Sequence, residues 1–167
     1  LSVCNAIDKV LFNEKIDGLA EWLPTLMEGA NKMNLDVQVD GAFFENMDGV
    51  TPITNEAIYH EEFLSPKILF SLVKDMDEAI DVINKYSGGH SGVIVSSDKE
   101  SADQFLNEVD CAAVYHNASS RFTDGGQFGF GAEIGISTGR LHARGPIGLN
   151  ELTTFQYHVL GEGATRS

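Results

Sequence analysis

A strand-like apolar run followed by a helix-like amphipathic run occurs twice in succession between residues 67 and 116. The run at 67–73 (KILFSLV) precedes a helical pattern over 75–86, and the run at 92–97 (GVIVSS) precedes a second helical pattern and a further apolar run at 111–116 (CAAVYH). Consecutive strand–helix units favour parallel strands joined by right-handed crossovers. We therefore predict an α/β fold with a parallel-rich sheet flanked by helices.

The first forty residues carry a similar alternation. Residues 6–13 favour a strand, and residues 17–33 place apolar side chains at helical spacing. Residues 35–39 alternate apolar and polar side chains, as a half-buried strand does. Pro24 is expected to break or kink the helix, because proline removes a backbone donor.

Polar residues predict where the two later helices begin. Asp75 and Glu78 have the spacing of an N-cap and its partner. Ser97 and Glu100 form a capping-box pattern before the apolar face of the next helix, so we expect Ser97 to be its N-cap.

A long segment rich in Gly, Ser, Thr and Arg, residues 117–148, follows these units. Loops of that length in compact domains are typically functional or cover a site. Residues 152–160 (LTTFQYHVL) then predict a final strand with apolar side chains on both faces. Because an exposed apolar edge invites pairing, we expect this strand to pair with another subunit. The alternative is an ordinary edge strand of the domain's own sheet.

The charge of the chain excludes some classes of partner. With 11 basic and 25 acidic residues, the formal net charge is -14, which opposes binding to nucleic acid and to anionic membranes. No stretch approaches the roughly 18 apolar residues of a membrane span. The chain begins with Leu1 and has no signal-peptide pattern, so we expect an excised piece of a longer, soluble protein.

Few side chains are candidates for chemistry. Two cysteines, Cys4 and Cys111, cannot form a disulfide framework, and we expect free thiols in a reducing compartment. Cys4 precedes Asn5 in a turn-like position and is either a reactive thiol or a small buried hydrophobe, whereas Cys111 fits the buried role better. No metal site is predicted, because the histidines lack paired-ligand spacing; they are His60, His90, His116, His142 and His158.

The glycine-rich segment 125–131 (GGQFGFG) has the glycine content of a phosphate-binding loop but lacks the G-x-G-x-x-G spacing. On its own it is better explained as a tight surface turn.

Several segments together resemble one family. They are 2–6 (SVCNA), 89–91 (GHS), 117–126 (NASSRFTDGG), 128–138 (FGFGAEIGIST) and 141–149 (LHARGPIGL). Over residues 2 to about 163 the chain is similar to the gamma-glutamyl phosphate reductase family, within the aldehyde dehydrogenase superfamily. The resemblance implies an aldehyde-dehydrogenase-like catalytic domain at 1–148 and a C-terminal oligomerisation strand and tail at 149–167. It also implies that the N-terminal NADPH-binding domain is largely absent from this chain.

The resemblance implies an activity as well. The family reduces L-glutamyl 5-phosphate to L-glutamate 5-semialdehyde and phosphate with NADPH, in L-proline biosynthesis, through a thioester on a cysteine. That role falls on Cys4, with the Cys4 backbone N–H and the Asn5 side chain as local donors to the oxyanion. We then expect a cytoplasmic homo-oligomer, or a mitochondrial one if the parent is a bifunctional eukaryotic enzyme. Whether a glutamate kinase domain or partner accompanies it stays open.

Binding residues follow from the same resemblance. Glu62, in the segment 61–66 (EEFLSP), corresponds to the carboxylate that holds the nicotinamide ribose; the alternative is a solvated acidic pair with Glu61. The substrate carries anionic groups and an ammonium, so its pocket needs a cation and an anion. These are Arg121 and Asp124, with hydrogen bonds from Asn117, Ser119 and Ser120.

Alternatives remain for the binding loop and for the function. Arg121 and Asp124 could form a salt bridge that only stiffens the loop, and Glu133 either caps loop amides or contacts substrate. The chain could belong to another thiol enzyme of the superfamily, such as a hydrolytic aldehyde dehydrogenase, or be a non-catalytic assembly module. A preference for acyl phosphate over free aldehyde, and the reactivity of Cys4, separate these functions.

Overall fold

Strands and helices alternate along the chain in the computed structural model, which describes residues 2–44 and 47–166. In order they are β1 (Lys9–Asn13), α1 (Leu19–Lys32), β2 (Asp36–Asp40), β3 (Val50–Pro52), η1 (Glu56–His60), β4 (Lys67–Val73), α2 (Met76–Tyr86), β5 (Ser91–Ile94), α3 (Lys99–Glu108), β6 (Ala113–His116), η2 (Ser120–Phe122), β7 (Ile136–Ser137) and β8 (Gly145–Pro146). No helix in this part of the chain combines the length and apolar character that crossing a membrane requires.

The larger sheet has the strand order β1-β4-β2-β3, and all of its neighbouring strands are parallel. Leu69 of β4 lies opposite both Lys9 of β1 and Gln38 of β2. The later strand β4 therefore lies between two strands that precede it in the chain. The predicted α/β class with a parallel-rich sheet is confirmed.

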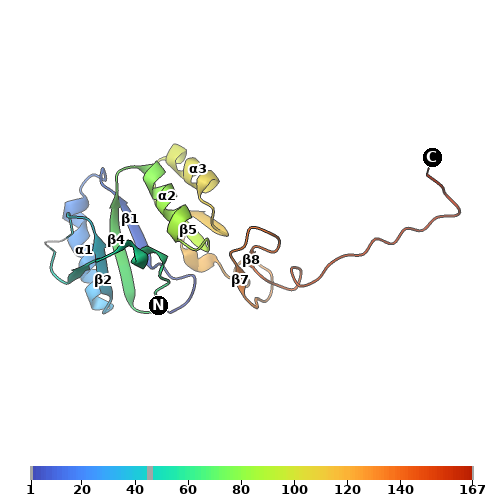
Figure 1. Cartoon of the computed structure of the whole chain (residues 1–167), viewed down its shortest axis with the longest axis horizontal. Helices are drawn as coiled ribbons and strands as arrows, with labels where there is room; N and C mark the ends of the chain where they lie inside the picture. The colour runs from blue at the N-terminus through green and yellow to red at the C-terminus, as the bar shows by residue number, and fades with distance from the viewer. Residues whose placement is uncertain (1, 45–46, 167) are drawn as a thin grey trace.

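The two faces of this sheet are covered by different elements, with α1 on one side and α2 on the other (Figure 1). On the first face Phe12, Val39 and Phe70 pack against Leu23 and neighbouring residues of α1, and the Phe12 and Phe70 rings meet edge to face with centroids 5.4 Å apart. On the other face Leu69 packs with residues of η1 and α2. This division follows from the alternation of side chains along each strand.

A second sheet contains β5 and β6, which are parallel, with Ser91 opposite Ala113. Its apolar side chains pack against α2 and α3 around a cluster of Ile80, Ile94, Phe105, Val109 and Cys111. Parallel pairing is thus confirmed for this second unit. Parallel pairing of β4 with β5, which the successive units predict, is wrong, because the two strands belong to different sheets. Helix α2 lies between the sheets: Ile80 packs in the cluster of the β5–β6 sheet, and Val82 packs against Leu69 of the larger sheet.

Of the two predicted helix N-caps, one is confirmed and one is wrong. Asp75 caps α2 as predicted, since its carboxylate accepts a hydrogen bond from the Glu78 backbone N–H at 3.0 Å. The prediction for α3 is wrong by one residue: Asp98 is the N-cap and accepts from the Ser101 N–H at 2.8 Å. Pro24 lies inside α1, which continues to Lys32.

The C-terminal segment is not a strand in this chain. Residues 152–160 are exposed, belong to none of the sheets in the described residues, and run away from the folded part of the chain (Figure 1). The alternative of an edge strand in the domain's own sheet is therefore wrong, whereas the strand that pairs with another subunit stays a prediction. An extended segment becomes a strand only where a neighbouring strand supplies hydrogen bonds, and none of the strands in the described residues pairs with this segment.

Candidate active site

Cys4 and Asn5 lie in a turn that precedes β1, where the Ala6 N–H donates to the Val3 carbonyl at 3.0 Å. Cys4 is exposed, so the buried-hydrophobe alternative is wrong for this residue. Cys111 is buried, as expected. Burial raises the pKa of the Cys111 thiol, which lowers its reactive thiolate fraction at neutral pH.

The Asn5 residue joins this turn to the loop at 119–124. The Ser120 hydroxyl donates to the Asn5 carbonyl at 2.7 Å, and the Arg121 guanidinium donates to Asn5 Oδ1 at 3.0 Å. Asn5 Nδ2 in turn donates to the Thr123 carbonyl at 3.0 Å and to the Arg121 carbonyl at 3.4 Å. The structure thus brings Cys4 and Asn5 together with Ser120 and Arg121, four residues that the sequence assigned to one site.

These bonds affect the role predicted for the Asn5 side chain. Its amide is engaged with the loop, and an oxyanion could replace only the longer contact, at 3.4 Å, without displacing the bond to Thr123. Asn5 therefore holds the loop in this structure, and its part as an oxyanion donor stays a prediction.

Loop residues predicted to bind substrate have distinct contacts. The Ser119 hydroxyl accepts from the Arg121 N–H at 3.2 Å, and Asp124 Oδ1 accepts from the Gln127 N–H at 3.0 Å. Arg121 binds Asn5 rather than Asp124, and no salt bridge between Arg121 and Asp124 occurs in the described chain. The salt-bridge alternative is therefore wrong.

Asn117 lies apart from this network. Its backbone has φ 52°, and its side-chain amide binds both backbone groups of Ser96, accepting from the N–H at 3.0 Å and donating to the carbonyl at 2.8 Å. It braces the segment after β5, and its contact with substrate stays a prediction.

The glycine-rich segment forms turns beside the same loop. Gly129 and Gly131 have φ 81°, which other residues rarely adopt. A Cβ at Gly125 would lie 2.9 Å from the Ala132 carbonyl oxygen, so only glycine fits this close approach. The Glu133 carboxylate accepts from the Gly125 N–H at 2.8 Å, which confirms the interpretation of Glu133 as a cap for loop amides.

Glu62 is exposed in a segment that two lysines anchor. Lys9 of β1 donates to the Glu61 carbonyl at 2.7 Å, and Lys67 of β4 lies 3.5 Å from the Glu61 carboxylate. Both ammonium groups also approach the ring of buried Phe63, at 4.7 and 5.0 Å from its centroid. Glu61 is therefore paired, while the Glu62 carboxylate is presented to solvent from an anchored segment.

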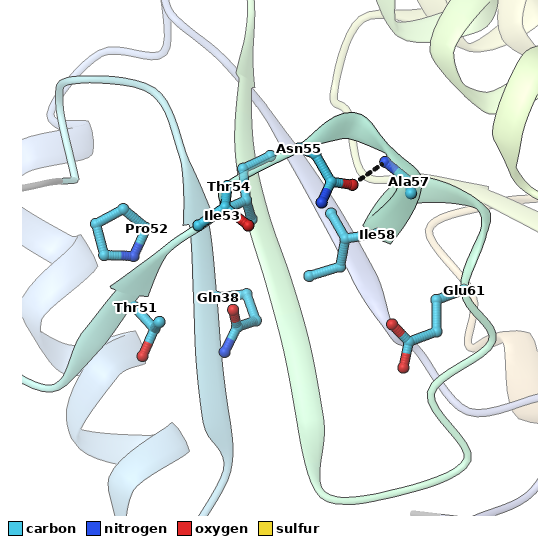
Figure 2. Close-up of a pocket in the computed structure, with 9 residues that line it drawn as sticks. All are labelled: Gln38, Thr51, Pro52, Ile53, Thr54, Asn55, Ala57, Ile58 and Glu61. Carbon is cyan, nitrogen blue, oxygen red and sulfur yellow. Dashed lines mark hydrogen bonds between the residues drawn. The ribbon is translucent and has the colours of Figure 1, made fainter.

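A cavity of about 430 Å³ opens on the η1 side of the larger sheet. Figure 2 shows Gln38 of β2 and Glu61 at its sides, with Ile58 of η1 between them. Asn55 caps η1 by accepting from the Ala57 N–H at 2.8 Å. The cavity adjoins the Glu61–Glu62 segment and contains none of the residues around Cys4.

A chain of hydroxyl groups beside Asn5 was not found from the sequence. Thr123, fully buried, lies with Oγ1 2.8 Å from Ser91 Oγ and 2.8 Å from the Tyr115 hydroxyl. Ser91 Oγ in turn lies 2.8 Å from His90 Nδ1. Only the presence of Ser91 and Thr123 in the family-like segments hinted at them, because Thr and Ser in a loop carry no periodic signal.

His90 lies at the end of this hydroxyl chain, in a partly buried position near two carboxylates. Burial lowers the pKa of His90, while Glu62 and Glu133 act in the opposite direction. Within residues 2–44 and 47–166 no three His, Cys, Asp or Glu side chains gather as a metal site would require.

Comparisons with known proteins place these features in context. The sequence model that describes the aldehyde dehydrogenase family matches residues 17–156 of this chain. Gamma-glutamyl phosphate reductase of Clostridium botulinum is 48% identical over 165 residues, which are 99% of this chain and 39% of that protein. The chain thus spans about two fifths of the length of this relative.

Solved structures agree with that similarity. The crystal structure of gamma-glutamyl phosphate reductase from Thermotoga maritima matches with a TM-score of 0.91 at 49% identity, over 99% of this chain and 39% of that one. An acetylating aldehyde dehydrogenase from Geobacillus thermoglucosidasius matches with a TM-score of 0.63 at 14% identity, over 96% of this chain and 45% of that one, which indicates a shared fold alone.

Proposed function

This chain belongs to the aldehyde dehydrogenase family, and we propose that it is the thiol-bearing part of a gamma-glutamyl phosphate reductase. The proposed reaction is the NADPH-dependent reduction of L-glutamyl 5-phosphate to L-glutamate 5-semialdehyde and phosphate, in L-proline biosynthesis. The observation that carries the proposal is the docking of the exposed Cys4 turn, through Asn5, onto the loop that contains Arg121.

Cys4 is the nucleophile in this proposal. Its thiolate attacks the carbonyl carbon of the acyl phosphate, a C–S bond forms, the C–O bond to phosphate breaks, and a thioester remains on Cys4. The Cys4 backbone N–H is the local donor proposed for the oxyanion. The cofactor, when bound, supplies the hydride that reduces the thioester, after which the C–S bond breaks and the aldehyde leaves. Phosphate is the leaving group of the first step, and the thioester accepts hydride in the second. Because no water molecule attacks the thioester, no water-activating carboxylate is needed.

The loop at 119–124 supplies the groups for substrate binding. Arg121 uses one N–H for Asn5, and a guanidinium has five, so its remaining donors suit a carboxylate or phosphate of the substrate. Asp124, unpaired with Arg121, suits the substrate's ammonium group. Ser119, Ser120 and Asn117 are the further hydrogen-bonding residues of this proposal.

Glu62 is the proposed contact to the cofactor. A carboxylate can accept hydrogen bonds from both hydroxyls of a ribose, and the exposure of Glu62 beside the lysine-anchored Glu61 fits that task. In the proposal NADPH also contacts residues outside this chain, because the 165 matched residues are 39% of the relative's length.

The same proposal divides the chain at residue 148. Residues 1–148 form the catalytic part, and residues 149–167 form an arm that pairs with a neighbouring subunit of a cytoplasmic homo-oligomer. The exposure of Phe155, Tyr157 and Val159, which contact no core here, supports this division.

The activity of the full-length protein tests the proposal. Glutamate semialdehyde is offered with NADP+, in the presence and absence of inorganic phosphate, and NADPH formation is followed. Oxidation that requires phosphate is expected of a reductase working in reverse. Phosphate-independent oxidation to the free acid would instead identify a hydrolytic aldehyde dehydrogenase. Absence of both activities, with an unreactive Cys4, would identify an assembly module.

A further inference from the structure

Thr123 contacts two parts of the molecule with different groups. Its hydroxyl is bound by Ser91 of β5 and by Tyr115 of β6, each at 2.8 Å. Its backbone carbonyl accepts from the Asn5 amide at 3.0 Å. One fully buried residue thus connects the second sheet to the turn that carries Cys4.

The backbone at Thr123 has little regular structure to hold it. Thr123 is the C-cap of η2, which has only 3 residues, and its φ of -71° and ψ of 85° belong to neither a helix nor a strand. Its N–H donates to the Ser120 carbonyl at 2.9 Å, and the direction of its own carbonyl then depends on this bond and on the contacts of its hydroxyl. Ser91 and Tyr115 lie on paired parallel strands, so the Thr123 hydroxyl is anchored on the rigid part of the domain.

The series of hydrogen-bonded hydroxyl groups ends at the imidazole ring of His90. His90 Nδ1 lies 2.8 Å from Ser91 Oγ, and Nε2 of the same ring is buried with no hydrogen-bond partner in the described part of the chain. A hydroxyl can donate only one hydrogen bond, so each member of the chain orients the next. Loss of one member removes a hydrogen-bond partner from each of its part-buried neighbours.

We propose that Thr123 is a positioning residue for the reaction at Cys4: its hydroxyl, held by Ser91 and Tyr115, orients the carbonyl that fixes Asn5 and the adjoining thiol. This inference rests on the proposed function of Cys4. Thr123 itself touches neither substrate nor cofactor in the proposal, and it acts through Asn5.

The test compares Thr123→Val with Thr123→Ser in the full-length reductase proposed to contain this chain. Valine keeps the branched shape and removes the hydroxyl, whereas serine keeps the hydroxyl. We expect Thr123→Val to lower kcat by about 10- to 100-fold, as misplacement of a reacting group by about 1 Å can, with KM for NADP+ unchanged. Thr123→Ser should stay within about threefold of wild type, since the anchoring bonds remain. Equal kcat values for the two variants, high or low, would overturn the proposal.

A double variant tests the route through Asn5. If Thr123 acts through Asn5, Asn5→Ala combined with Thr123→Val should be no slower than Asn5→Ala alone. Losses that multiply would show that Thr123 acts by another route and would overturn the proposal.

Tyr115→Phe serves if Thr123→Val does not fold, because it removes the outer hydroxyl and leaves Thr123 in place. A kcat at least about threefold lower at unchanged KM for NADP+ supports the proposal, and an unchanged kcat overturns it. The matched control is Tyr86→Phe, which removes a hydroxyl that donates to Glu56 and, within the described part of the chain, has no hydrogen bond to Asn5 or Thr123. The kcat of this variant should equal that of wild type.

Cys4→Ser in the same protein separates the two levels of inference. If Cys4→Ser keeps activity, the proposed function of Cys4 fails. If Cys4→Ser is inactive while Thr123→Val keeps wild-type kcat, only the positioning role of Thr123 fails.

Discussion

The side-chain amide of Asn5 donates a 3.0 Å hydrogen bond to the backbone carbonyl of Thr123, 118 positions later in the chain. This bond and its neighbours make the Cys4 turn and the Arg121 loop one structural unit, although neither belongs to a sheet. The thiol therefore depends for its position on the loop, and changes in the loop should be felt at Cys4.

Exchange of the two cysteines for serine should have opposite effects on activity. In the full-length protein, Cys4→Ser should abolish phosphate-dependent oxidation of glutamate semialdehyde with NADP+, because the hydroxyl is a far weaker nucleophile than a thiolate. Cys111→Ser should keep most of the activity, since Cys111 packs in the core near β6. Circular dichroism checks that both variants fold. Loss of activity in Cys111→Ser alone would contradict the assignment of Cys4.

The two thiols should also differ in their rate of alkylation. Cys4 is exposed, whereas Cys111 is 7% exposed and burial raises its pKa. Since the thiolate is the reactive form, a raised pKa keeps Cys111 protonated at neutral pH and its alkylation slow until the pH is raised. Peptide mapping after brief treatment with iodoacetamide at pH 7 should find the label on Cys4. Faster labelling of Cys111 would contradict this expectation.

The isolated chain of residues 1–167 should show no measurable NADPH binding. In the proposed function Glu62 binds one ribose, which is a small part of what a dinucleotide needs. Isothermal titration calorimetry of the chain with NADPH is the measurement. Binding with a micromolar dissociation constant would refute the expectation.

Removal of residues 152–167 from the full-length protein should convert the oligomer to monomers. Along this segment Phe155, Tyr157 and Val159 are 74%, 82% and 91% exposed, which is costly for a free chain and suits a strand that adds to a neighbour's sheet. Sedimentation velocity measures the state of assembly, and circular dichroism should show retained secondary structure. An oligomer of unchanged mass would rule out this role.

Two glycine substitutions should change stability in opposite directions. A Cβ at buried Gly92 would lie 2.9 Å from Val109 Cγ1, a stiff side chain, so Gly92→Ala should destabilise the chain by about 1–3 kcal/mol. Gly29 lies exposed inside α1 with open space around it, so Gly29→Ala should stabilise it by about 0.5–1 kcal/mol. Urea unfolding of both variants measures the difference, and a stabilising Gly92→Ala would show that this packing is looser than the contact indicates.

Asp110 should contribute stability that depends on pH. It accepts a hydrogen bond from Arg144 at 2.8 Å, and this bond, together with the charge of Arg140, lowers the pKa of its carboxyl group below the ordinary 3.8. A lowered folded-state pKa means that the contribution is fully present above the unfolded-state pKa and is lost as the pH falls through the folded-state pKa.

The difference in Tm between wild type and Asp110→Asn should therefore be constant above about pH 5 and shrink toward zero under acid conditions. Arg144→Met should show the same trend, because it removes the partner of the same carboxylate. A difference in Tm that grows as the pH falls would contradict the lowered pKa of Asp110.

The sequence predicted those elements whose side chains repeat with a local period. The helical spacing within 17–33 and the alternation at 35–39 correspond to α1 and β2, because burial of one face leaves a period that neighbouring residues record. The cap at Asp75 was predictable for the same reason, since it involves residues three positions apart. The cap of α3 was wrong by one residue because Ser97 and Asp98 are both good caps and the backbone decides between them.

Strand order and strand formation at the C-terminus depended on distant contacts. The insertion of β4 between β1 and β2 leaves no local pattern, because it depends on which apolar faces meet. The apolar pattern of 152–160 indicated a strand, but a strand needs a partner backbone, and the pattern cannot say whether this chain supplies one.

The candidate site also has parts that the sequence predicted and parts that depend on distant contacts. By itself the sequence determined the parallel α/β class, and its family-like segments singled out Cys4, Glu62 and Arg121 as candidates. Only the tertiary structure decided that Asn5 holds the loop and that Thr123 ties it to the second sheet. The physical reason is that a hydrogen bond between residues 118 positions apart depends on how the chain is packed, which no local period of side chains records.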